Sequence, residues 1–128
     1  MDPIFLGLGE IFEVQANQVG LYGGSADIRD LGLLTWILAM PRWSNRGIYL
    51  HADMPEMAAA YLFHIVKNHP FVDGNKRVGT MAAYVFLRLN GLELACTNDA
   101  LVKLVLAVAD SKADKAAVAA FFRRFAKP

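Results

Sequence analysis

Two apolar segments with helical spacing flank a polar stretch, HPFVDGNKRVG at residues 69–79, and this arrangement constrains the fold more than any other feature. Before the stretch, apolar side chains recur at Met57, Ala58, Tyr61, Leu62, Ile65 and Val66. After it, they recur at Val78, Met81, Ala82, Val85, Phe86 and Leu89. This period is typical of helices that bury one face. We therefore predict two packed helices, over residues 54–68 and from Asn75 or Lys76 to Leu89, joined by a polar loop.

Residues with known preferences for helix ends support this prediction. Asp53 lies three residues before Glu56, as in a capping box, and Pro55 suits a first helical turn. Asn90 and Gly91 supply the left-handed backbone with which many helices end. Signals for a helix start and a helix stop thus bracket the pair.

Apolar periodicity predicts four further helices, so the chain is expected to be mainly α. They cover residues 4–19, 30–41, 98–110 and 114–126. Residues 42–52, RWSNRGIYLHA, have no helical period and are predicted to form an extended loop or a short hairpin. Trp36 is expected in the core, and Cys96 is expected to be a small buried residue. No repeat or linker divides the sequence, which predicts a single domain over residues 1–128.

Composition and charge exclude several classes of protein. Apolar residues make up 55% of the chain, yet no uncharged apolar run approaches the roughly 18 residues of a membrane-spanning helix. The first residues lack the pattern of a signal peptide, which predicts a cytoplasmic protein. A net charge of +1 does not favour direct binding of nucleic acid, and one cysteine gives neither a disulfide framework nor a metal site.

The polar loop combines residues suited to phosphate. The turn Asp73-Gly74-Asn75 leads directly into the second helix, whose first backbone N–H groups have no partner within the helix. Such amides form an anion site. Lys76 adds a mobile positive charge there, and Arg77 can hold phosphate oxygens in a fork.

The same loop also offers a metal ligand and a base. Asp73 beside a phosphate is a hard oxygen ligand of the kind that Mg²⁺ accepts. His69 is the one side chain of the loop that can take a proton near neutral pH. Phosphate, metal and base together suit attack by a hydroxyl on a nucleotide phosphate. Neither a P-loop nor a dinucleotide-binding pattern is present, and on these residues alone a polar turn without chemistry stays an alternative.

The loop resembles the signature of the Fic/Doc superfamily, HxFx[DE]GNxR. The matching positions are His69, Phe71, Asp73, Gly74, Asn75 and Arg77. The resemblance extends to LYGGSADIRDLGLL (21–34), AAAYLFHIVKNHPFVDGNKR (58–77) and FLRLNG (86–91), which are similar to the death-on-curing (Doc) branch. It implies a compact helical bundle whose central helix follows the signature loop, with residues 42–52 as the flap that positions the target peptide.

The resemblance also implies roles for single residues. His69 would be the general base that deprotonates the target hydroxyl, and Phe71 would anchor the loop in the core. Asp73 would bind Mg²⁺. The phosphates of ATP would be held by Gly74, Asn75, Lys76 and Arg77.

Two positions distinguish the activities found in the superfamily. The Fic branch, which transfers AMP, continues its signature as GNGRxxR, whereas this chain has Lys76 and Thr80 in place of the second glycine and the last arginine. The Doc branch carries the same Asn-Lys-Arg and transfers the terminal phosphate of ATP to a threonine of elongation factor Tu. The resemblance therefore implies a protein-threonine kinase that arrests growth. A Fic-type AMP or nucleotidyl transferase and a non-catalytic antitoxin-binding module are the alternatives.

Regulation is expected to come from a second protein. Many Fic proteins carry an inhibitory helix with the pattern [ST]xxxE[GN], but here no serine or threonine is followed by glutamate four positions later. A toxin of this branch would need a separate antitoxin, expected to be Phd-like with a disordered C-terminal segment that folds into a groove. Arg42 and Trp43 are candidates for contact with a partner. His51 is expected at the surface and His64 in a packing role.

Overall fold

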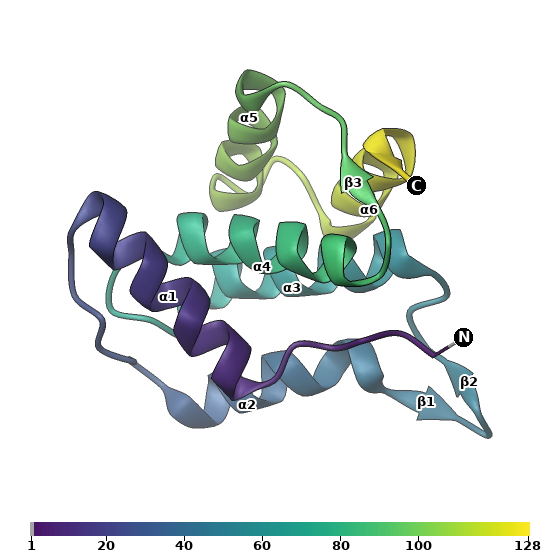
Figure 1. Ribbon diagram of the computed structural model, residues 1–128, viewed down its shortest axis with the longest axis horizontal. Helices are drawn as coiled ribbons and strands as arrows, with labels where there is room; N and C mark the ends of the chain where they lie inside the picture. The colour runs from purple at the N-terminus through teal and green to yellow at the C-terminus, as the bar shows by residue number, and fades with distance from the viewer. Residues whose placement is uncertain (1) are drawn as a thin grey trace.

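The computed structural model describes residues 2–128, which form six α-helices, four short strands and one 3₁₀ turn (Figure 1). The helices are α1 (Leu8–Tyr22), α2 (Leu31–Ala39), α3 (Met54–Asn68), α4 (Asn75–Leu89), α5 (Asn98–Ala109) and α6 (Lys115–Phe125). The strands are β1 (Ser44–Asn45), β2 (Ile48–Tyr49), β3 (Glu93–Leu94) and β4 (Ala126–Lys127), and the 3₁₀ turn is η1 (Met40–Arg42). The prediction of a mainly α fold is confirmed.

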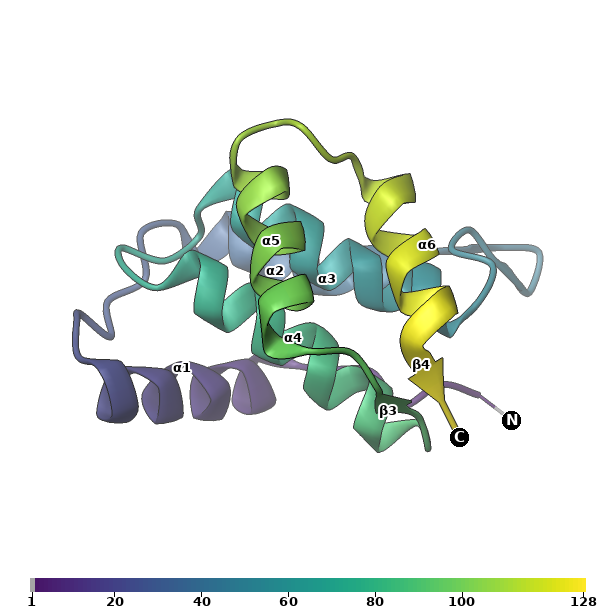
Figure 2. The same ribbon diagram turned by 90° about the horizontal axis from the view of Figure 1, so that it is seen from above.

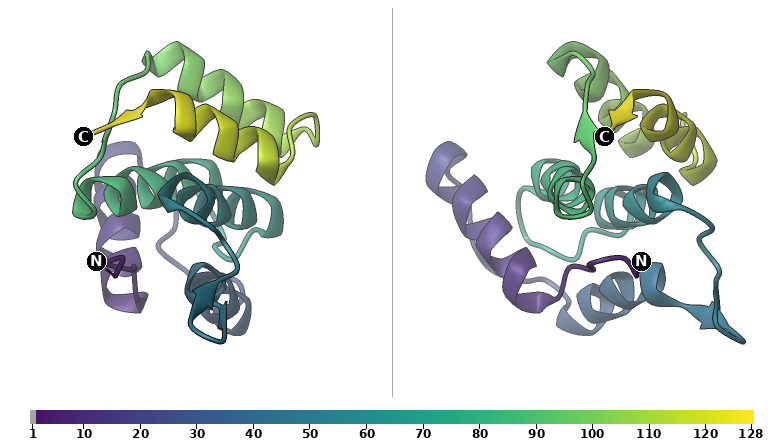
Figure 3. Two further views of the ribbon diagram at one scale, coloured as in Figure 1. Left: turned by 90° about the vertical axis from the view of Figure 1, so that its right-hand side faces the viewer. Right: turned by 45° about the vertical axis from the view of Figure 1, so that its right-hand side comes forward.

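The helices form three layers, of which the central pair, α3 and α4, is the middle one (Figure 3). Helices α5 and α6 cover one side of this pair, as Figure 2 shows from above, and α1 and α2 lie on the other side. The central helices have the bounds that periodicity predicts, and Asp53 accepts the backbone N–H of Glu56 at 3.0 Å, as a helix cap does. The polar loop thus connects the two helices that bury the most side chains. None of the helices within residues 2–128 is long and apolar enough to cross a membrane.

Gly79 allows α4 to approach α3 closely. A Cβ atom at this position would lie 3.0 Å from Cγ2 of Val66 and 3.2 Å from the carbonyl oxygen of Leu62. These distances are shorter than ordinary van der Waals contact, so a larger residue would push the two helices apart. Gly20 of α1 offers a matched comparison, because a Cβ atom there would meet nothing within 4 Å.

We expect alanine to have opposite effects at these two glycines. Gly20→Ala should raise the free energy of unfolding by up to about 1 kcal/mol through helix propensity. Gly79→Ala should lower the free energy of unfolding by about 1–3 kcal/mol, because overpacking between α3 and α4 outweighs the gain in helix propensity. Urea unfolding of both variants measures the difference, and equal shifts in the two midpoints would contradict the close approach of α3 and α4.

The segment predicted as an extended loop or a hairpin forms the hairpin β1–β2, which projects from one edge of the bundle (Figure 1). Its pairs are Ser44 with Tyr49 and Asn45 with Ile48. Arg46 and Gly47, between the strands, have φ values of 54° and 79°. Positive φ at both central positions is typical of a type I′ turn, which suits the twist of a two-residue hairpin.

The first helix starts four residues later and ends three residues later than the predicted range, 4–19. The side chain of Asn90 binds both backbone groups of Ile4, accepting from its N–H at 2.7 Å and donating to its carbonyl oxygen at 2.9 Å. The N–H of Leu6 donates to the hydroxyl of Tyr61 at 3.0 Å. These bonds to distant parts of the chain hold the first residues outside the helix, and local periodicity does not reveal them.

Several smaller expectations are wrong. Trp36 is 47% exposed rather than part of the core, and it packs edge-on against Trp43 with ring centroids 5.8 Å apart. The face that α2 buries consists of Leu34, Ile37 and Leu38. Cys96 is only partly buried. The last helix, by contrast, lies within one residue of its predicted range, 114–126, since it runs from Lys115 to Phe125 and is capped by Asp114. The chain after it forms β4, which pairs antiparallel with β3.

Candidate functional site

The candidate base stands where α3 ends. His69 has φ 51° and ψ 60°, a left-handed conformation that is uncommon for a residue other than glycine. Its side chain is exposed. The left-handed residue ends the helix and turns the chain toward Phe71, so the imidazole lies at the surface at the junction of the two central helices.

Phe71 and Asn75 close the loop from within. Phe71 is 1% exposed and Asn75 is 8% exposed. The N–H of Phe71 donates to Oδ1 of Asn75 at 3.0 Å, and Nδ2 of Asn75 donates to the carbonyl oxygen of Phe71 at 3.0 Å. The same Nδ2 lies 3.4 Å from Nδ1 of His69. The Asn75 side chain is thus occupied inside the loop.

Helix α4 begins without a side-chain cap. Asp30, Asp53, Thr97 and Asp114 cap α2, α3, α5 and α6 by accepting a backbone N–H. Gly74 precedes α4 with φ 77°, and no side chain of residues 2–128 takes the capping position there. The first turn of α4 carries Lys76 and Arg77 and no acidic residue. Uncapped amides, the helix dipole and two cations together favour an anion at this point.

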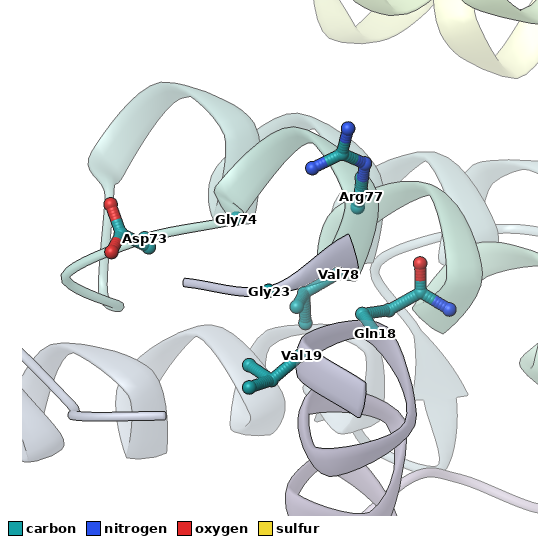
Figure 4. Close-up of a pocket in the computed structure, with 7 residues that line it drawn as sticks. All are labelled: Gln18, Val19, Gly23, Asp73, Gly74, Arg77 and Val78. Carbon is teal, nitrogen blue, oxygen red and sulfur yellow. The ribbon is translucent and has the colours of Figure 1, made fainter. Parts of the chain in front are cut away.

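Arg77 lies beside a small pocket between the end of α1 and the start of α4 (Figure 4). The pocket is lined by Gln18, Val19, Gly23, Asp73, Gly74, Arg77 and Val78. The guanidinium of Arg77 lies 4.3 Å from the centre of the Tyr22 ring, which is a cation–π contact. The end of α1 therefore forms one wall of the site, although the sequence pattern assigns no chemistry to Tyr22 or its neighbours.

Asp73 presents an exposed carboxylate next to this anion site. Its Oδ2 accepts the backbone N–H of Ser25 at 3.0 Å, which orients the group. Within the part of the chain that the structure describes, no three His, Cys, Asp or Glu side chains converge to hold a metal ion by themselves. An Mg²⁺ ion here would take its other ligands from phosphate and water, as Mg²⁺ commonly does beside nucleotides. One oriented, exposed carboxylate fits that arrangement.

The chain between α1 and α2 lies along the loop. Ile28 and Phe71 form an isolated antiparallel β-bridge, and the N–H of Val72 donates to the carbonyl oxygen of Asp27 at 3.1 Å. Ser25 and Arg29, in the same segment, contact the loop at Asp73 and at the end of α3. This support joins residues about 40 positions apart in the sequence, so motif spacing does not predict it.

Thr80 has no free donor for a phosphate. Its hydroxyl donates to the carbonyl oxygen of Lys76 at 2.7 Å, one helical turn earlier. Lys76 itself is exposed. The first turn of α4 therefore offers the cations of Lys76 and Arg77, and the next turn adds none at position 80.

Two histidines lie outside this site and share one cation. Nζ of Lys115 is 3.1 Å from Nε2 of His64 and 3.3 Å from Nε2 of His51. His64 packs against Phe63 and Trp36, as its predicted packing role requires. His51 is half-buried rather than at the surface, which corrects the expectation for it. Burial, and then the charge of Lys115, lowers the pKa of His64 from 6.5 to about 4.

The lowered pKa of His64 predicts lower stability in mild acid. The unfolded chain binds a proton at this imidazole below about pH 6.5, whereas the folded chain resists it until about pH 4. The contribution of neutral His64 to the free energy of unfolding is complete above pH 6.5 and is lost as the pH falls toward 4. After discounting for partial exposure, we expect a loss of about 1 kcal/mol between pH 7.5 and 5. His64→Gln should weaken this dependence in urea unfolding; an unchanged dependence would contradict the assignment to His64.

Comparison with known proteins places these features in a family. The chain matches the model of the Fic/DOC family over residues 5–87. It is 40% identical to Toxin Doc of Mycolicibacterium smegmatis over 78 residues, which are 61% of this chain and 60% of that protein. It is 29% identical to Protein kinase doc of Escherichia phage P1 over 116 residues, or 90% of each chain. The matched region includes the loop, both central helices up to Leu87, and the segment that supports the loop.

Proposed function

Because the chain belongs to the Fic/DOC family, we propose that it is a Doc-type protein kinase and a growth-arresting toxin. The γ-phosphate of ATP passes to a threonine hydroxyl of a translation factor, for which elongation factor Tu is the candidate. The observation that carries the proposal is the uncapped start of α4, with Lys76 and Arg77 in its first turn, six residues after the exposed His69. Two relatives bear the names Toxin Doc and Protein kinase doc, which supports both parts of it.

The proposed transfer uses the loop residues in distinct roles. The first amides of α4, with Lys76 and Arg77, bind the phosphates of ATP. Asp73 would hold Mg²⁺, which neutralises charge on the phosphates when bound. His69 accepts the proton of the threonine hydroxyl as its oxygen attacks the γ-phosphorus. A new P–O bond forms to threonine, the bond from the γ-phosphorus to the bridging oxygen breaks, and ADP leaves.

Lys76 and Thr80 support transfer of the γ-phosphate over transfer of AMP. Lys76 puts a bulky cation where the AMP-transferring branch has glycine, and Thr80 is bonded to the Lys76 carbonyl oxygen instead of supplying an arginine. Together these two residues change which phosphates of ATP the start of α4 can bind. Because they favour transfer of the γ-phosphate, a nucleotidyl transferase is only the second candidate.

Partners follow from the same proposal. A toxin of this kind requires a cognate antitoxin, proposed to be Phd-like with a disordered C-terminal segment that folds on binding. We propose that both proteins act in the cytoplasm, where translation factors are found. Co-expression should yield a complex of toxin and antitoxin.

Labelled ATP tests the proposed reaction. The protein is incubated with Mg²⁺ and ATP labelled at either the α or the γ phosphorus, once with purified elongation factor Tu and once with a cell lysate that contains other protein targets. We expect protein-bound label from the γ position alone, on threonine. Label from the α position alone would support the nucleotidyl transferase, and label from neither would support a non-catalytic antitoxin-binding module.

A further inference from the structure

The end of α3 has a conformation that its own residues do not favour. His69 is left-handed, with φ 51°, and a residue with a Cβ atom adopts this region at a cost in free energy. Glycine or asparagine is the usual residue at such a helix end. The last carbonyl groups of α3 also have no partner within the helix. Contacts from outside the helix must hold this end if the imidazole is to keep its position.

Arg29 binds three consecutive carbonyl groups at this end. Its guanidinium donates from Nε to the carbonyl oxygen of His69 and from Nη2 to that of Asn68, the second at 2.7 Å. Its backbone N–H donates to the carbonyl oxygen of Pro70 at 2.8 Å. Guanidinium hydrogen bonds are charge-assisted, and a positive charge complements the C-terminal end of a helix. One residue from another part of the chain thus fixes the backbone on both sides of the His69 side chain.

Neither an ion pair nor core packing accounts for Arg29. In residues 2–128, carboxylate partners within 4.0 Å are found for Arg88 and Arg123 but not for Arg29. Arg29 is exposed, so its side chain does not fill the core. The guanidinium instead donates hydrogen bonds to the two carbonyl groups at the end of α3.

We propose that Arg29 is a positioning residue that holds His69 left-handed and so aims its imidazole at the target hydroxyl. The inference rests on the proposed function, in which His69 accepts a proton. The direction of the Cα–Cβ bond follows from φ and ψ, so relaxation of residue 69 into a right-handed or extended conformation would carry the ring away. A displacement of about 1 Å from a reactive geometry costs roughly 10²-fold in rate.

Three variants of the full chain test the proposal. Arg29→Met keeps an unbranched flexible side chain, although a shorter one, and removes every side-chain donor. Arg29→Lys keeps a positive charge but loses the planar fork that spans two carbonyl groups. Arg88→Met is the matched control, because Arg88 pairs with Glu93 at the surface and has no contact with the loop. Each variant is assayed for kcat, KM for ATP, stability to urea, and the ¹³Cα and ¹³Cβ chemical shifts of His69.

Arg29→Met should lower kcat about 10²-fold with KM for ATP changed less than about threefold, because the phosphate site on α4 is untouched. The His69 shifts should leave the left-handed range. Arg29→Lys should recover part of kcat, and Arg88→Met should match the wild type. An unchanged kcat in Arg29→Met overturns the proposal. A fall in kcat no larger than the fraction of molecules that are unfolded overturns it as well.

The wild type separates this proposal from the kinase assignment. If it transfers label only from the α position, the kinase assignment fails, and the same comparison of kcat with α-labelled ATP still decides the role of Arg29. If it transfers neither label, His69 is not a base in this chain and the positioning role is overturned with it.

Discussion

His69→Gly is expected to reduce phosphate transfer strongly while leaving the protein at least as stable as the wild type. A general base contributes about 10²- to 10⁴-fold to rate, so transfer of the γ-phosphate should fall by that factor. Stability should not fall, because glycine adopts the left-handed conformation of residue 69 without the steric cost of a Cβ atom. The free energy of unfolding should stay equal to that of the wild type or rise by up to about 1 kcal/mol. A loss of activity without a loss of stability separates the chemistry of His69 from its place in the fold.

Two further measurements make this prediction specific. Free imidazole, which can occupy the space left by the side chain, should restore part of the transfer in His69→Gly. His64→Gln removes a histidine from the cluster with Lys115, outside the loop, and should retain transfer near the wild-type level at pH 7.5. Full activity in His69→Gly would rule out a general base at this position, and an equal loss in His64→Gln would show that the effect is not local.

The central part of the fold could be predicted from the sequence because its determinants are local. Apolar spacing defines α3 and α4, and the cap at Asp53 marks where α3 begins. The start of α1 could not be predicted in this way. Asn90 holds Ile4 outside the helix across 86 positions, and this bond overrides the helical period of the first residues. The exposure of Trp36 is a similar case, since α2 is apolar on several faces and tertiary packing chooses which one is buried.

The residues of the candidate site likewise fall into those that the local sequence predicts and those that only the fold brings together. The loop residues are contiguous, so composition alone indicates an anion site at Gly74 and the first turn of α4. Residues that orient the loop come from the segment between α1 and α2, where Ser25 binds Asp73 and Arg29 binds the end of α3. A backbone N–H and an exposed arginine have no spacing signature. Resemblance marks the segment, but only the fold shows which atoms it holds.

Asn75→Asp should damage both the stability of the protein and its transfer activity. The substitution keeps the acceptor for the N–H of Phe71 but replaces the NH₂ donor with oxygen, 3.0 Å from the carbonyl oxygen of Phe71. A carboxylate at this buried position loses a hydrogen bond and gains a repulsion, so we expect a loss of about 3 kcal/mol near neutral pH. Transfer by the folded protein should also fall about 10- to 100-fold, because the loop carries His69 and Asp73.

The pH dependence of this loss identifies its cause. The new carboxyl group would lie inside the loop, facing the carbonyl oxygen of Phe71, and not on the exposed side of the first turn of α4. We expect burial and this carbonyl to outweigh the positive end of the helix and to raise the pKa of the group in the folded state above its unfolded value of about 3.9. The deficit relative to the wild type should therefore be small near pH 4, where the group is protonated and donates to the Phe71 carbonyl. It should grow as the pH rises through the folded-state pKa. A deficit independent of pH would indicate a packing defect instead of a buried charge.

Asn90→Asp is the matched control for this change. Asn90 makes the same two-sided contact with Ile4, at 2.7 and 2.9 Å, but lies at the far end of α4 from the loop. Its substitution should lower stability in urea while leaving transfer per folded molecule unchanged. If Asn75→Asp alone reduces transfer per folded molecule, the Asn75 amide connects the closure of the loop to the position of the base. If both variants keep full transfer, the buried amide of Asn75 stabilises the fold only, and the orientation of His69 depends on the contacts that Arg29 makes.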